Sequence, residues 1–113
     1  MSTIRNRVQL IGNLGDDPEI TTLESGKKVT RFSLATNEYY KNKKGEKVQS
    51  TQWHSIVAWG RNAEVIEKYG EKGKEIAIEG KLTHRSYENA NGERRYVTEV
   101  VANEILFLGT KSE

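Results

Sequence analysis

Two tryptophans occupy one segment of alternating polarity, and their spacing suits the stacking of nucleic-acid bases. Trp53 and Trp59 are six residues apart within residues 50–59. Side chains alternate between the faces of a strand, so both indoles are expected on one face, roughly 20 Å apart at about 3.3 Å per residue. Tyr87 likewise shares its expected face with the cation Arg85. Flat rings beside cations bind bases and phosphates, so this pattern favours nucleic-acid binding.

A place in the core or in a subunit interface is the alternative for each aromatic residue taken singly, because large rings are usually buried. Phe32, Tyr69 and Phe107 are expected in the core, since each aligns with aliphatic neighbours. Pattern alone assigns Tyr39 and Tyr96 to neither group. It also leaves open a protein-interaction module whose aromatic face binds another protein.

The carboxylates do not form a catalytic set. Asp16 and Asp17 stand beside Pro18 in a turn signal, where Asp favours local backbone hydrogen bonds. The chain has no cysteine and only two histidines, His54 and His84, which excludes cysteine-based zinc sites. We therefore expect no enzyme, no metal and no cofactor.

Length and charge indicate one small domain with a local anion site. The 113 residues carry a net charge of only +2, too small for binding by bulk charge. Residues 39–48 alone carry four lysines against one glutamate, between two expected strands, and predict a basic hairpin tip. No apolar run reaches the roughly 18 residues that cross a bilayer, so we expect a cytoplasmic protein with no membrane contact.

The expected elements are about five long strands and one short helix. Asn62 is the expected cap of the helix and Gly70 its end. An order with the helix between the third and fourth strands favours an all-β, five-stranded barrel, closed or partly open. The expected long strands are residues 4–14, 28–36, 50–59, 76–87 and 94–108, with a short segment at residues 19–23 between the first two, and the expected helix is residues 63–69.

Ordered motifs occur at residues 8–19, 32–36, 51–54, 73–74 with 78–82, and 96–101, and together they span nearly all 113 residues. Through these motifs the chain resembles bacterial single-stranded DNA-binding proteins of the type that forms homotetramers. This resemblance implies an OB-fold with long extended hairpins. It also implies sequence-independent binding of single-stranded DNA in replication, recombination and repair, in the bacterial cytoplasm and at the nucleoid.

The resemblance also implies which residues contact the strand. Four aromatics match the family's base-stacking positions: Tyr40, Trp53, Trp59 and Tyr87. Six cations are the corresponding candidates for phosphate contacts: Arg5, Arg7, Lys41, Arg61, Lys72 and Arg85. His54 matches a histidine that the family places near subunit contacts.

Family members usually continue into an acidic C-terminal tail that recruits replication and repair proteins, whereas this sequence stops at Glu113. We therefore expect residues 1–113 to be a single binding domain without that tail, and recruitment of such proteins is in doubt. The alternative within the same fold is an interaction module of a primosome-like assembly.

Overall fold

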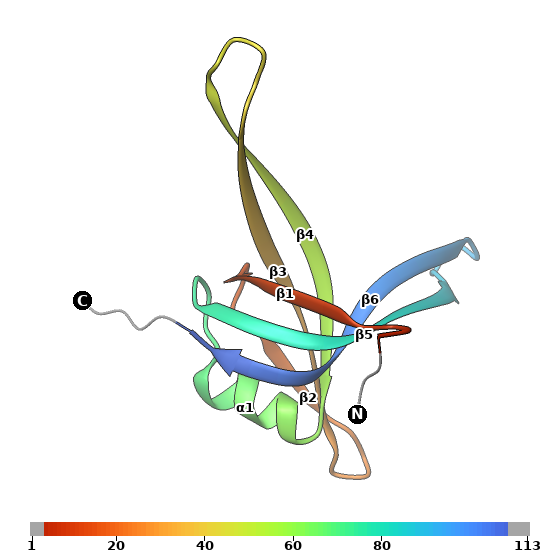
Figure 1. Ribbon diagram of the computed structural model, residues 1–113. Coiled ribbons are helices and arrows are strands. Elements are labelled where there is room, and N and C mark those ends of the chain that lie inside the picture. The colour runs from red at the N-terminus through yellow and green to blue at the C-terminus, as the bar shows by residue number, and fades with distance from the viewer. Residues whose placement is uncertain (1–3, 109–113) are drawn as a thin grey trace.

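The computed structural model describes residues 4–108, and in these residues a closed barrel of five strands carries one helix (Figure 1). The hydrogen-bonded order is β1-β5-β6-β4-β3, which closes through β1–β3 pairing, and β2 extends the sheet beside β3. This confirms the predicted fold class. The elements are β1 (Val8–Leu14), β2 (Glu19–Thr22), β3 (Lys28–Lys41), β4 (Lys47–Trp59), α1 (Arg61–Tyr69), β5 (Glu75–Glu88) and β6 (Arg94–Phe107).

Closure of the barrel depends on a close approach of β1 to β3. Asn13 and Leu14 pair with Ala35 and Leu34. A Cβ atom at Gly12 would lie 2.2 Å from the carbonyl oxygen of Ala35, so only glycine permits this contact. β1 itself begins at Val8, four residues later than predicted, because residues 4–6 form a turn.

The core is mainly aliphatic and lies inside the barrel, with α1 packed against it. Leu34, Ile56 and Ile76 are fully buried, as is Ile66 of the helix. Helix α1 begins after Gly60 without a side-chain cap, so the prediction for Asn62 was wrong. The Asn62 side chain instead donates hydrogen bonds of 3.2 Å to the carbonyl oxygens of Ala102 and Asn103, and so fastens the helix to β6.

The prediction of three core aromatics was correct for two of them. Phe32 is buried, and Phe107 is partly buried against the core. Tyr69 is 50% exposed, contrary to prediction, and its ring meets that of Phe107 edge-on at a centroid distance of 6.0 Å. The ring at the end of α1 therefore covers the rim of the core rather than entering it.

Two long hairpins extend beyond the barrel (Figure 1). We call residues 37–51 the β3–β4 arm and residues 83–98 the β5–β6 arm. Cross-strand pairing continues in the first from Asn37↔Thr51 to Lys41↔Lys47, so β3 runs five residues past its predicted end. The basic segment is the tip of this arm, as predicted.

The tips of the arms share one turn chemistry. Asn42 Oδ1 accepts hydrogen bonds from the backbone N–H groups of Lys44 at 2.9 Å and Glu46 at 3.0 Å. Asn89 Oδ1 accepts the equivalent bonds from Asn91 at 2.9 Å and Glu93 at 3.0 Å. A glycine with positive φ follows three residues after each asparagine. The same side-chain-supported turn therefore ends both arms.

Candidate nucleic-acid interface

Strand register places Trp53, Trp59 and Tyr87 on one continuous outer surface. Trp53 and Trp59 alternate with the core residue Ile56, so they face away from the core. Val57, on their face, pairs with Val101 of β6, and that face continues across the β5–β6 pairing to Tyr87. We call this surface the aromatic face. The three rings are 63%, 39% and 44% exposed, as stacking platforms require.

The indole of Trp53 lies against a glycine, which has no side chain. Trp53 pairs with Ala35 across β3–β4, and its ring reaches over Gly15 in the turn after β1. A Cβ atom at Gly15 would lie 2.6 Å from the indole Cζ3. Glycine at this position therefore lets the indole lie close to the barrel while most of the ring remains exposed.

Cations accompany the other two platforms. The Lys27 Nζ lies 5.6 Å from the ring centroid of Trp59, and Arg61 is exposed at the start of α1, two residues further on. The Arg85 guanidinium carbon lies 5.6 Å from the ring centroid of Tyr87. Each of these two rings thus has a positive charge within reach of a backbone phosphate.

A buried carboxylate organises the charges between the platforms. Glu99 is only 5% exposed on β6. It accepts a hydrogen bond of 3.2 Å from Arg31 Nε, and bonds of 3.1 and 3.3 Å from Arg85 Nε and Nη2. Burial raises the pKa of Glu99, but the hydrogen bonds and charges of Arg85 and Arg31 outweigh it, so the pKa lies below its usual value.

Sequence reasoning missed Arg31 and Glu99. A signal was present, because Glu99 is the one charge within the β-branched run from Val97 to Val101. A buried charge is retained only with partners, so a carboxylate in such a run predicts nearby cations. Their identity needed the fold, because Arg31 lies 68 residues away in the chain.

Tyr40 lies on the other face of the β3–β4 arm. It pairs with Val48, five residues from Ala35, so its side chain leaves the ribbon opposite to Trp53. Tyr39 shares the face of Trp53 instead, with the Lys47 Nζ 4.8 Å from its ring centroid. Both tyrosines are exposed. The structure therefore does not bring Tyr40 together with the other three predicted stacking residues.

The remaining predicted cations are spread over the surface. Lys41 is exposed at the end of β3, and Lys72 is exposed after α1, where its backbone N–H donates to Asp17 Oδ1 at 2.8 Å. Arg5 is exposed in the turn before β1. Arg7 pairs with Glu79 of β5. Of the six, Arg85 and Arg61 are closest in sequence to the platforms.

His54 is half-buried, and its Nε2 lies 2.9 Å from the Thr36 hydroxyl. It lies on the inward side of β4, where that strand leaves the barrel. Its predicted role at a subunit contact stays a prediction.

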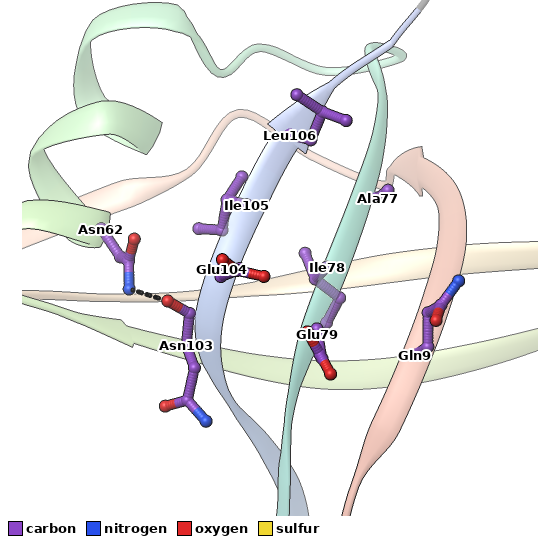
Figure 2. Close-up of a pocket in the computed structure, with 9 residues that line it drawn as sticks. All are labelled: Gln9, Asn62, Ala77, Ile78, Glu79, Asn103, Glu104, Ile105 and Leu106. Atoms are coloured by element: carbon purple, nitrogen blue, oxygen red, sulfur yellow. Dashed lines mark hydrogen bonds between the residues drawn. The ribbon is translucent and has the colours of Figure 1, made fainter. Parts of the chain in front are cut away.

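A row of apolar side chains crosses β1, β5 and β6 on the outside of the barrel. Ile11 pairs with Ala77, and Ala77 with Leu106, so three apolar side chains stand in a row across three strands. Ile11 and Leu106 are both at least half exposed. Beside them lies a hollow of about 480 Å³, whose wall includes Asn62, Asn103 and Leu106 (Figure 2). We call this row the apolar stripe.

Among residues 4–108, no group of three or more His, Asp or Glu side chains could hold a metal ion. The single helix of this region is too short to cross a membrane.

The sequence matches the model of the single-strand binding protein family over residues 5–108. It is 44% identical over 107 residues to "Single-stranded DNA-binding protein 1" of Chlorobaculum tepidum, covering 94% of this chain and 66% of that protein. It is 38% identical over 108 residues to a single-stranded DNA-binding protein of Xanthomonas campestris, covering 96% and 63%. The chain thus spans just under two thirds of each of these relatives.

Two solved structures share the fold. The Plasmodium falciparum SSB in complex with ssDNA superposes with a TM-score of 0.83 at 34% identity, covering 96% of this chain and 97% of that one. A deletion mutant of the single-stranded DNA binding protein from Thermus aquaticus gives 0.78 at 30% identity, covering 91% and 50%.

Proposed function

The chain belongs to the single-strand binding protein family, and from this membership we propose that it binds single-stranded DNA without sequence preference. The observation that carries the proposal is the aromatic face, where Trp53, Trp59 and Tyr87 are exposed among cations. Every base offers a π-face, so stacking contributes roughly 1–3 kcal/mol per base whatever the sequence. The family is non-enzymatic, which agrees with the sequence-based expectation.

Phosphate neutralisation supplies the second part of the binding energy. Arg5, Arg7, Lys41, Arg61, Lys72 and Arg85 are the proposed contacts. Release of counterions at these contacts makes affinity fall as salt rises. Arg7 is paired one-to-one with Glu79, which offsets its charge, so its contribution is expected to be the smallest of the six.

Tyr40 is the fourth proposed stacking residue, and its place implies a particular path for the strand. Because Tyr40 and Trp53 leave opposite faces of the β3–β4 arm, one strand reaches both only by passing around that arm. We propose that a long strand wraps the arm, while a short strand covers the aromatic face alone.

We propose that the role in the cell is to protect strands exposed in replication, recombination and repair. The corresponding location is the bacterial cytoplasm, at the nucleoid.

We propose further that the protein assembles as a homotetramer through the apolar stripe. Exposed apolar rows of this kind are stabilised by burial against a partner. His54 is the proposed contact at a second interface. Light scattering at micromolar concentration is expected to give four times the mass of the 12.8 kDa chain. A monomer would contradict the assembly, and Leu106→Glu is expected to produce smaller species.

Intrinsic fluorescence tests the binding proposal directly, because the chain has only two tryptophans. Trp53→Phe and Trp59→Phe each leave one indole as reporter. Titration with oligo-dT is expected to quench both variants strongly, whereas a duplex of equal length quenches neither. Absence of quenching at low salt, in a protein whose thermal unfolding transition shows that it is folded, would favour the protein-interaction module instead.

Two tyrosines of the β5–β6 arm provide a matched pair of variants. Tyr87 lies on the aromatic face, whereas Tyr96 pairs with Ser86 on the reverse face and is 79% exposed. Tyr87→Ala is expected to weaken oligo-dT binding by about 5-fold or more, the lower end of the stacking range. Tyr96→Ala is expected to leave it unchanged, and equal losses would contradict the assignment of the face.

A further inference from the structure

Among residues 4–108, the two arginines that hold Glu99 retain hydrogen-bond donors without a partner. Arg31 uses only Nε on Glu99, and Arg85 uses Nε and Nη2. A guanidinium carries five N–H donors in a planar fork, so Arg31 keeps both Nη groups and Arg85 keeps Nη1. Their side chains are 52% and 43% exposed. We call Arg31, Arg85 and Glu99 the trio. Its two positive charges exceed the single negative charge, so the trio is positive at the surface.

The trio lies between two stacking platforms. Arg31 and Glu99 line a hollow of about 230 Å³ together with Ser33 and Ser55, and Ser55 is two residues from Trp53 on the same face. On the other side, Arg85 lies against the ring of Tyr87. The backbone between a base on Trp53 and a base on Tyr87 therefore passes over the two guanidinium groups.

Asp16 also lines this hollow. Its carboxylate repels a phosphate that approaches from the β1–β2 turn. The favourable approach is therefore from the side of Arg85, where the described residues place no second carboxylate within 4.0 Å of its guanidinium group.

We propose that Arg31 and Arg85 bind one backbone phosphate between the bases stacked on Trp53 and Tyr87, and that Glu99 positions both guanidinium groups for it. The inference rests on the proposed binding of single-stranded DNA and adds Arg31 and Glu99 to its site. A planar guanidinium can present two parallel N–H groups to phosphate oxygens, which an ammonium cannot do. Holding the side chains in advance reduces the entropy that binding would otherwise cost.

Glu99 has two opposite effects on an approaching strand. Its negative charge weakens the attraction, whereas its hydrogen bonds hold the arginines in place. Removing the charge alone would therefore tighten binding if Glu99 only neutralised the arginines. It weakens binding if Glu99 positions them, so the sign of the change distinguishes the two roles.

The first experiment compares three arginine variants in oligo-dT titrations at several salt concentrations. Arg31→Met is expected to reduce the magnitude of the slope of log affinity against log salt by about 0.7, the value for one phosphate contact. It is expected to weaken the affinity about 5-fold at 0.1 M salt. Arg31→Lys is expected to keep the slope but lose affinity. Arg94→Gln, on the reverse face of the β5–β6 arm, removes the same charge as a matched control and leaves the slope within about 0.2 of the wild type.

The second experiment uses Glu99→Gln, with thermal unfolding as the check on folding. Binding is expected to weaken at least 2-fold despite the gain of one positive charge. If this variant does not fold, Arg31→Met still decides, because the Arg31 side chain is about half exposed. An abasic oligomer of equal length, which keeps the phosphates, should show the same loss of slope for Arg31→Met.

The outcomes separate this inference from the proposed function. Failure of the wild-type protein to bind oligo-dT would overturn the proposed function. Wild-type binding with an unchanged slope for Arg31→Met, or tighter binding by folded Glu99→Gln, would overturn the inference alone.

Discussion

The two arms of the molecule end in the same turn but carry their charges differently. The β3–β4 arm has four lysines, and none of them forms an ion pair within the described part of the chain. The β5–β6 arm has three arginines, and each is paired with a glutamate: Arg85 with Glu99, Arg94 with Glu88 and Arg95 with Glu93. One arm presents lysines without a carboxylate partner among the described residues, and the other presents arginines that are each paired with a carboxylate.

This difference predicts that the two arms make different contributions to the binding of a single strand. Unpaired lysines on exposed stems attract phosphates over a distance and make binding depend on salt. Arginines fixed by carboxylates contribute less net charge but a defined geometry beside Tyr87. We therefore expect the β3–β4 arm to dominate the salt dependence, and the base of the β5–β6 arm to dominate the placement of bases.

The largest expected effect comes from removing the lysines of the β3–β4 arm. Exchange of all four for glutamine is expected to lower the salt slope by about 3 and the affinity for oligo-dT by two to three orders of magnitude near 0.1 M salt, if each contacts one phosphate. Titrations at four salt concentrations measure both. The comparison on the other arm is Arg94→Gln with Arg95→Gln, which removes two charges, and an equal loss per charge there would remove the difference between the arms. The four lysines are Lys41, Lys43, Lys44 and Lys47.

Replacing the tip residues of the β3–β4 arm is expected to have the second-largest effect on binding. Lys43→Ala with Lys44→Asn gives the β3–β4 arm the tip residues of the other arm while leaving the Asn42 turn intact. Affinity is expected to fall roughly 20-fold and the salt slope by about 1.4, for two phosphate contacts. The melting temperature should stay within about 2 °C, because both side chains are exposed. A loss of stability instead would assign these lysines to the fold.

The two tyrosines of the β3–β4 arm test the path of the strand. Tyr40→Ala is expected to weaken binding of a long oligo-dT about 5-fold, the lower end of the stacking range, and to leave a short oligo-dT unaffected. Tyr39→Ala should cost less, since Lys47 already occupies one side of that ring. The reverse order, measured by the same titrations, would restrict the strand to the aromatic face.

Lowering the pH is expected to have the smallest effect, which is a loss of stability at the base of the β5–β6 arm. Because the pKa of Glu99 is lowered in the fold, its carboxylate stabilises the protein above the usual value of 4.5, and this contribution is lost as pH falls through the lower folded value. Urea unfolding at pH 7 and pH 3 is expected to show a larger loss for the wild type than for Glu99→Gln. Parallel losses would mean that the ion pairs at the base of the β5–β6 arm contribute nothing measurable.

Local sequence patterns were sufficient for most of the elements and for part of the site. Strand alternation correctly separated the exposed Trp53 and Trp59 from the buried Ile56, because that period is a property of the backbone. The helix cap was misassigned at Asn62, since the competing partners, two carbonyl oxygens of β6, lie some 40 residues away. Tyr69 was misassigned because helical spacing indicates a face but not how deeply that face is buried.

The sequence by itself determined the all-β class, the basic hairpin tip, the two indoles on one outer face and, through its motifs, the family. All of these depend on short-range periodicity, turn residues or ordered local matches. Only the tertiary structure decided that Tyr40 and Trp53 leave opposite faces, that Gly15 supports an indole, and that Arg31 and Arg85 share Glu99. These depend on strand register and barrel closure, which bring together side chains far apart in the chain.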